Sequence, residues 1–538
     1  MTIKYFSKEE FKKRCVGNLF QNLGFLILEF VFLATPIFIA FSYGYQHMGE
    51  NLAYRYFGVA RLSDGNYADI WFPQGHLTSL LHSSVYYLME KFGNLNASEY
   101  SLKFNIFGYG SNLIVIIFFI AFLAYIYFKG ALLLRDKCLI LLLTGLILFG
   151  FGRAGFDYSL VPDYYQLNQV LVILMLSIFI ALYRADPILI SKKISLFIGI
   201  YLGIAVTNKI TMLPLALISI SPILSHINFS EKKKAFINLV IIGISLVSTT
   251  LIILTFLYQG NIWEALLSFR KIFMYATNQW SEPNFSLLIR GYLIQFKYGV
   301  PLLLYIFLSI ILLKQIILKK IQSRKAIFCS ILMVFYGCFS IYTIFRRGTG
   351  TTFYEVAITL SMMSMAMLVI LGGYKKLHQV VVVTILLTIT TNLFYSAVLN
   401  NFVESVKREG EDQLKGWEFF NKLQSRHSKL TVIVPNNDYA FGPFEVFIKG
   451  FSNFPSWNIE YGQRYLNSFN SPITFRSFQS NLTPLQSYSN DNVIVWFDIE
   501  GKTPMSDAYP IFKTILSERK CAKELIVLGL TAVVCNEK

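Results

Sequence analysis

Residues 237–257 read INLVIIGISLVSTTLIILTFL, and no charged side chain interrupts them. A helix needs ~20 predominantly apolar residues to cross the hydrocarbon core of a bilayer, and this run has that length. Three lysines, Lys232 to Lys234, stand directly before it. Because lysine and arginine collect in cytoplasmic loops, the run predicts a transmembrane helix that starts at the cytoplasmic surface.

The same pattern recurs along the chain. Of its 538 residues 54% are hydrophobic and only 15% are charged, a composition too apolar for an ordinary soluble protein. We therefore predict a polytopic α-helical membrane protein with about eleven spans. Their approximate bounds are 18–43, 106–128, 138–152, 165–183, 194–206, 210–225, 237–257, 299–318, 326–345, 354–373 and 380–399. The fifth and sixth are short and meet at Thr207-Asn208-Lys209, so an ordinary pair and a broken or re-entrant pair both remain open.

The basic residues set the predicted orientation. The net charge of +17 lies in short clusters between apolar runs, unlike the continuous basic face of a nucleic-acid-binding protein. With the N-terminus in the cytoplasm, these clusters fall in the inside loops, and an odd number of spans leaves the C-terminus outside. The first apolar run is too long for a signal peptide and reads as an uncleaved span. We expect a multi-pass protein of a bacterial-type inner (plasma) membrane.

The chain divides into two predicted domains. Residues 1–399 form the transmembrane domain, with long outside loops at about 44–105 and 258–298. From residue 400 to 538 the sequence becomes polar, and two β-like runs, 430–434 and 492–497, predict a small extracytoplasmic α/β domain. Cys521 and Cys535 flank an apolar run, and an oxidising compartment permits a disulfide between them. Paired and free thiols both remain open.

Ionisable residues near the predicted outer membrane surface carry the functional signal. Charge at the depth of a spanning helix is costly and usually faces a cavity or a partner. A carboxylate there can accept the proton of an attacking hydroxyl, while cations stabilise a departing phosphate. Such chemistry suits glycosyl transfer from a lipid phosphate. Helix termination, headgroup contact and interfacial anchoring are the plainer alternatives for each residue. The candidate carboxylates are Glu50, Asp157 and Asp163, and the candidate cations are Arg153, Lys209, Arg270, Arg290, Arg346 and Arg347.

The first outside loop contains a longer pattern. From Glu50 to Gly93 it reads E-x-x-x-Y, then D-G-x-Y-x-D-x-W-F-P-Q-G, then an apolar stretch ending F-G. This segment resembles the first extracytoplasmic loop of the GT-C membrane glycosyltransferases, the superfamily of protein O-mannosyltransferases and aminoarabinose transferases. Residues 207–214, TNKITMLP, are similar to that family's Lys-x-Thr-x-x-x-x-Pro-like stretch.

The resemblance implies a membrane enzyme that moves a hexosyl or pentosyl group from a polyprenyl-phosphate carrier to an extracytoplasmic envelope glycan, lipid or protein. The family often has an acidic pair after its first span. Here Gly49 occupies the first position, so Glu50 alone matches as general base, and Asp157 or Asp163 would supply a second carboxylate. Tyr54 and Asp69 fall in the loop pattern and are assigned to substrate binding, with loop ordering an equal alternative for Asp69.

Other functions share this location. A transporter or flippase for lipid-linked glycans needs similar cations and aromatic residues, and an envelope-glycan polymerase or ligase joins whole oligosaccharides. The sequence holds no Walker A loop and no G-x-G-x-x-G motif, which removes the usual support for ATP-driven transport and dinucleotide chemistry. No metal-ligand set is predicted, because no acidic cluster is dense enough to require a metal ion. The sequence leaves open whether a divalent metal assists as a cofactor.

Overall fold

The computed structural model describes a helical part and a sheet-containing part. The described residues are 8–43, 97–129, 132–151, 155, 164–184, 192–209, 212–225, 232–258, 260–264, 266–267, 270, 286, 289, 296–347, 350–392, 398–427, 429–434, 473–477, 492–499, 503–504, 507, 510–527 and 530–536.

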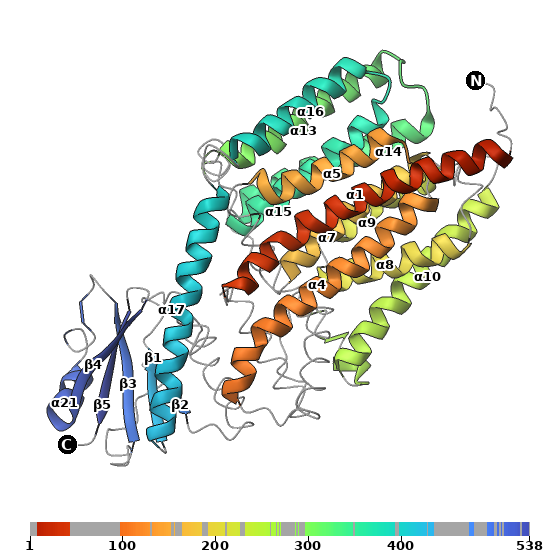
Figure 1. Cartoon of the computed structure of the whole chain (residues 1–538). Helices are drawn as coiled ribbons and strands as arrows, with labels where there is room; N and C mark the ends of the chain where they lie inside the picture. The colour runs from red at the N-terminus through yellow and green to blue at the C-terminus, as the bar shows by residue number, and fades with distance from the viewer. Residues whose placement is uncertain are drawn as a thin grey trace.

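Long helices lie side by side as one bundle (Figure 1). Each predicted span falls mainly on one of them. The helices are α1 (Lys8–Ser42), α4 (Ala97–Lys129), α5 (Leu134–Phe149), α7 (Tyr164–Arg184), α8 (Lys192–Asn208), α9 (Leu213–Leu224), α10 (Lys232–Leu257), α13 (Phe296–Ile317), α14 (Arg324–Arg347), α15 (Gly350–Ile370) and α16 (Lys375–Thr390).

Six of these helices are long and apolar enough to cross a bilayer: α1, α7, α10, α13, α14 and α15. The chain is thus a polytopic helical membrane protein, while the expected total of about eleven spans stays a prediction. Several bounds differ from the predicted ones. Helix α4 already begins at Ala97, within the stretch predicted as the first outside loop, and α16 ends at Thr390, before the predicted end of the last span at residue 399.

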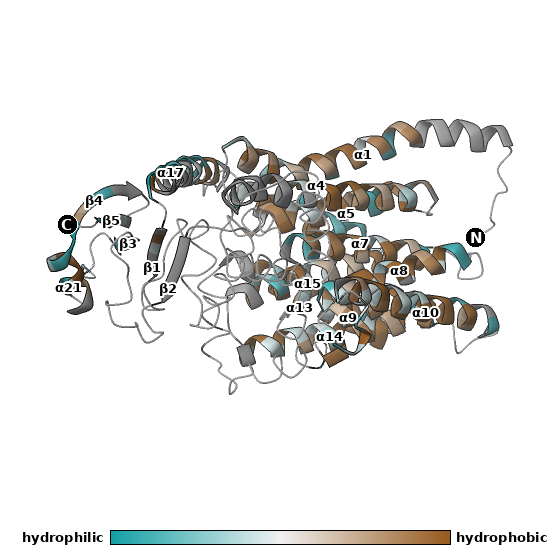
Figure 2. Ribbon diagram, turned by 90° about the horizontal axis from the view of Figure 1, so that it is seen from below, coloured by the Kyte–Doolittle hydropathy of each residue, from teal (hydrophilic) through white to brown (hydrophobic). Residues whose placement is uncertain are grey.

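Burial separates central helices from peripheral ones. Most of the apolar stretches of α7 and α15 are buried inside the bundle, whereas most residues in those of α10 and α14 are not fully buried. Exposed side chains such as Ile244, Phe256 and Phe335 are large and apolar, which suits contact with lipid tails. In Figure 2 the helices of the bundle are largely brown, the colour of hydrophobic residues.

Helices α8 and α9 meet at the turn of residues 207–209, where the sequence leaves an ordinary pair and a broken or re-entrant pair open. Because a helix rises ~1.5 Å per residue, the 12 residues of α9 are too few to cross a ~30 Å core. Helix α8 packs most extensively against α10, and α9 packs against α7 and α14. The two helices therefore have different main neighbours, and most residues of α9 are buried in the bundle.

Two glycines explain the close packing of α8 against α10. A Cβ atom at Gly199 would lie 2.5 Å from the carbonyl oxygen of Ile242, and one at Gly203 would lie 2.7 Å from that of Leu246. Small residues four apart let two membrane helices approach closely. The spacing of Gly199 and Gly203 thus fixes the position of α8, and with it the residues at its C-terminal end.

The C-terminal part contains a five-stranded sheet in the order β2-β1-β3-β5-β4. Three of the strands pair in parallel: β1 (Lys429–Val434), β2 (Ile473–Ser477) and β3 (Asn492–Ile499). Strand β5 (Leu530–Asn536) runs antiparallel to both of its neighbours, β3 and β4 (Lys520–Val527). The strands predicted at 430–434 and 492–497 are present as β1 and β3. The rings of Trp496 on β3 and Phe512 on α21 (Pro510–Glu518) pack 5.1 Å apart.

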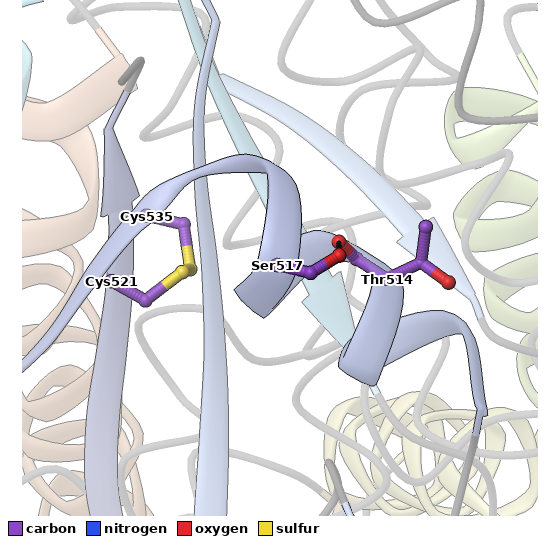
Figure 3. Close-up of a disulfide and its surroundings, with 4 residues drawn as sticks. All are labelled: Thr514, Ser517, Cys521 and Cys535. Atoms are coloured by element: carbon purple, nitrogen blue, oxygen red, sulfur yellow. Dashed lines mark hydrogen bonds between the residues drawn. A yellow bond between two sulfur atoms is a disulfide. The ribbon is translucent and has the colours of Figure 1, made fainter.

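A disulfide joins Cys521 and Cys535, which face each other across β4 and β5 (Figure 3). The α21 residues Thr514 and Ser517 lie nearby, where the Ser517 hydroxyl donates a hydrogen bond of 2.8 Å to the Thr514 carbonyl. Helix α17 (Val398–Arg426) runs between the bundle and the sheet and contacts α1, β1 and β4 (Figure 1). The sheet is thereby held at one end of the bundle.

Candidate functional site

The bundle has two polar ends. Helix α8 ends, and α7, α9 and α15 begin, at the end that faces the sheet, which we name the outer end after the predicted orientation. The N-terminus of a helix carries a partial positive charge from its unpaired backbone N–H groups. Three helix N-termini at one end therefore favour a negatively charged ligand there.

Lys209 lies in the turn that follows α8. Its backbone N–H continues the helical pattern by donating to the Ala205 carbonyl at 3.0 Å, and its carbonyl accepts from the Met212 N–H at 2.8 Å. The hydroxyl of Thr207 donates back to the Gly203 carbonyl at 2.8 Å. These bonds end the helix in a tight turn. The sequence placed Lys209 near the membrane surface, whereas the structure buries it inside the bundle.

The ammonium group of Lys209 forms an ion pair with the carboxylate of Glu355 on α15. Only 6% of the Lys209 side chain is exposed, against 27% of that of Glu355. A buried charge needs a partner, because its desolvation is otherwise too costly. Glu355 supplies that partner from a helix 146 residues further along the chain.

Two residues in the first turns of α7 hold the flanks of this ion pair. Asn208 donates a hydrogen bond of 2.9 Å from its side-chain amide to the amide oxygen of Asn168. Gln169 donates one of 2.6 Å to the hydroxyl of Tyr354. Since Asn208 precedes Lys209 and Tyr354 precedes Glu355, these contacts connect α7, α8 and α15 in one polar network, hereafter the outer polar ring.

The outer polar ring extends into neighbouring helices. Gln169 also donates to the carbonyl of Gly155 at 3.1 Å, and the Tyr354 hydroxyl donates to that of Ile147 at 3.4 Å. On the other side of α7, the Gln166 amide lies 3.5 Å from the carbonyl of Asn112 on α4. Gln166, Asn168 and Gln169 thus form a polar, buried group near the start of α7, whereas most of the following residues of that helix are apolar.

This arrangement offers a cation, a carboxylate and several amides in a site of restricted water access. An ammonium group is a point charge with three donors, suited to phosphate oxygens. A carboxylate can accept a proton from a hydroxyl. The outer polar ring therefore has the chemical groups that holding a phosphate and assisting the attack of a hydroxyl require.

The structure describes only part of the predicted site. Lys209 belongs to the outer polar ring, Arg270 is exposed, and Arg346 and Arg347 are the last residues of α14. The remaining predicted residues lie outside the described part of the chain, so their predicted roles stay predictions. They are Glu50, Tyr54, Asp69, Arg153, Asp157, Asp163 and Arg290.

The sequence analysis missed Glu355, Asn168 and Gln169. Glu355 is the single charged residue of α15, and the cost of a charge within a spanning helix is the signal by which it was detectable. Asn168 and Gln169 carry no charge, and only their burial sets them apart. Among the described residues, no group of three or more His, Cys, Asp or Glu side chains is placed to hold a metal ion.

Comparison with known proteins gives one overall likeness. No protein-family model and no curated protein sequence matches the chain. Among solved structures, the crystal structure of ArnT from Cupriavidus metallidurans bound to undecaprenyl phosphate is similar over 94% of this chain and 97% of its own. The TM-score is 0.42 and the sequence identity 11%.

Proposed function

We propose that this protein is a membrane glycosyltransferase that moves a sugar from a polyprenyl-phosphate carrier to an extracytoplasmic acceptor. The observation that carries the proposal is the buried Lys209–Glu355 pair within the outer polar ring. A buried lysine at the end of the bundle where α7, α9 and α15 begin suits a phosphate that enters along the membrane with its prenyl chain in lipid. The acceptor is an envelope glycan, lipid or protein.

In the proposed reaction, an acceptor hydroxyl attacks the anomeric carbon of the donor sugar. Glu50 takes the hydroxyl proton as general base, the new glycosidic bond forms, and the bond from carbon to phosphate oxygen breaks. The electron pair passes to the leaving phosphate, whose negative charge Lys209 stabilises. Arg346 and Arg347, at the end of α14, are proposed as further cations for the phosphate, and Asp157 or Asp163 as a second carboxylate.

The disulfide between Cys521 and Cys535 supports the proposed location. Disulfides persist in oxidising compartments such as the bacterial periplasm and are rare in the cytosol. We therefore propose a bacterial inner-membrane protein whose N-terminus is cytoplasmic and whose C-terminal sheet is periplasmic. This orientation also places the outer polar ring at the periplasmic side, where a lipid-linked sugar donor would be used.

The test uses the full chain in nanodiscs with radiolabelled polyprenyl-phosphate sugars, undecaprenyl-phosphate sugars first. We expect release of the labelled sugar to water or acceptor, with a loss of at least about 100-fold in Glu50→Gln, since general bases contribute ~10²–10⁴-fold. Glu404→Gln, on an exposed position of α17, is the matched control. Full activity of a correctly inserted Glu50→Gln protein would remove Glu50 as the base. Binding of lipid-linked glycans without release from any donor would favour a flippase.

A further inference from the structure

We infer that Glu355 is a displaceable counter-ion, which leaves Lys209 when the phosphate of the lipid carrier binds. The inference rests on the proposed function, because it assigns a second state to the same site. In the empty site the carboxylate neutralises the lysine. In the loaded site a phosphate oxygen takes the place of the carboxylate oxygen.

The unequal burial of the two partners supports this exchange. Lys209 is nearly enclosed, whereas more than a quarter of the Glu355 side chain is exposed, at 27%. A ligand that reaches the pair from the accessible side thus meets Glu355 first. The carboxylate can move into water at small cost, while the lysine stays where a phosphate would find it.

The outer polar ring keeps the site assembled during the exchange. The hydrogen bonds from Asn208 to Asn168 and from Gln169 to Tyr354 fix the residues next to Lys209 and Glu355. Neither bond uses the ammonium group or the carboxylate. The Glu355 side chain can therefore rotate away while α8 and α15 remain tied to α7.

At the opposite end of the bundle, the carboxylate of Asp136 is held firmly in its ion pair. Asp136 on α5 is fully buried and accepts two hydrogen bonds from Arg184, of 2.9 and 3.0 Å. It also accepts one of 3.0 Å from the backbone N–H of Leu133. Three donors and complete burial hold Asp136 in place. Among the described residues Glu355 has one such contact, with Lys209, and is partly exposed.

Charge also favours displacement. Phosphate carries at least the charge of a carboxylate and offers more acceptor oxygens to the lysine and to the helix N-termini around it. Once phosphate is bound, the nearby Glu355 carboxylate is repelled by it. Removal of the Glu355 charge should therefore strengthen phosphate binding, the reverse of what the loss of a ligand-binding residue would do.

The experiment measures the affinity of the full chain in detergent micelles for undecaprenyl phosphate without a sugar. In Glu355→Gln we expect Kd to fall roughly three- to tenfold, because the competing carboxylate is gone. Unchanged or weaker binding by a folded Glu355→Gln protein would overturn the inference. Asp412→Asn is the control, because it removes the carboxylate of the Lys415–Asp412 ion pair on the surface of α17. It should leave Kd unchanged.

Two further variants cover an unstable Glu355→Gln protein. Glu355→Asp keeps the charge but shortens its reach, and tighter binding than wild type supports displacement, while equal or weaker binding opposes it. The double variant Lys209→Gln/Glu355→Gln should bind more weakly than wild type. If neither wild type nor Glu355→Gln binds the lipid, the inference and the donor assignment both fail. If wild type binds and Glu355→Gln binds less, only the inference fails.

Discussion

The outer and inner ends of the bundle use the same residue types for different purposes. Each end has a buried lysine, a carboxylate in an ion pair and a hydrogen bond between a glutamine and a tyrosine. At the inner end Lys137 contacts the Asn22 side chain, Asp136 pairs with Arg184, and the Tyr374 hydroxyl donates to Gln315 at 2.7 Å. The outer end has the ring formed around Lys209 and Glu355.

The inner contacts close helix ends. Arg135 on α5 donates a hydrogen bond of 2.8 Å to the carbonyl of Gly372, just beyond α15. Lys325 on α14 donates one of 2.8 Å to the carbonyl of Tyr183, at the end of α7. Cations near the C-terminal carbonyls of helices are stabilising. The inner-end cations Arg135, Lys137, Arg184 and Lys325 thus have partners within the protein itself. At the outer end Lys209 follows the C-terminus of α8, but its ammonium group pairs with a partly exposed carboxylate on α15, at the end where α7, α9 and α15 begin. Helix N-termini favour an anion as the partner.

The largest expected difference between the two ends concerns their lysines. We predict that Lys209→Gln lowers sugar transfer by roughly 10²–10³-fold, the loss typical of removing one group that stabilises developing negative charge. Lys137→Gln at the inner end should leave the activity of the folded protein near that of wild type. Assay in nanodiscs of protein matched for folded amount tests both. Equal losses in the two variants would show that lysine burial, rather than phosphate binding, is what matters.

The carboxylates should differ in the quantity that they affect. Asp136→Ala leaves Arg184 without its buried partner, and we predict a loss of about 3 kcal/mol in the free energy of unfolding, since breaking a buried ion pair costs ~3–5 kcal/mol. Its activity per folded molecule should stay unchanged. Unfolding of the purified protein by denaturant in micelles measures the free energy of unfolding, and the transfer assay measures the activity. A stable but inactive Asp136→Ala protein would contradict the division between the ends.

The glutamines should show the smallest effect. Gln169→Ala removes the hydrogen bond that Gln169 donates to the Tyr354 hydroxyl. A buried polar group that loses its partner lowers the free energy of unfolding by ~1–3 kcal/mol. Because Gln169 holds the position of Tyr354, next to Glu355, we expect a modest decrease in affinity for undecaprenyl phosphate, up to about tenfold. Gln315→Ala breaks the matching bond at the inner end and should alter stability alone. Lipid titration of the two variants side by side compares them.

The sequence by itself determined the class of protein. Uninterrupted apolar runs such as 237–257 need no partner to identify them as spans, because the bilayer imposes length and hydropathy on each helix separately. The strands at 430–434 and 492–497 were readable for a similar reason, as short β-branched runs. Lys209 stood out as a charge between two apolar runs. Each of these signals is local.

The tertiary structure decided which residues meet. Helix packing brings Glu355 to Lys209 across 146 residues of sequence, and it buries Asn168 and Gln169 on a face of α7 that no periodicity in the polar residues revealed. It also decided that the turn at Lys209 lies inside the bundle and that Cys521 faces Cys535. Pairing between distant segments depends on how helices and strands pack in three dimensions, and the composition of a single segment carries no record of its neighbour.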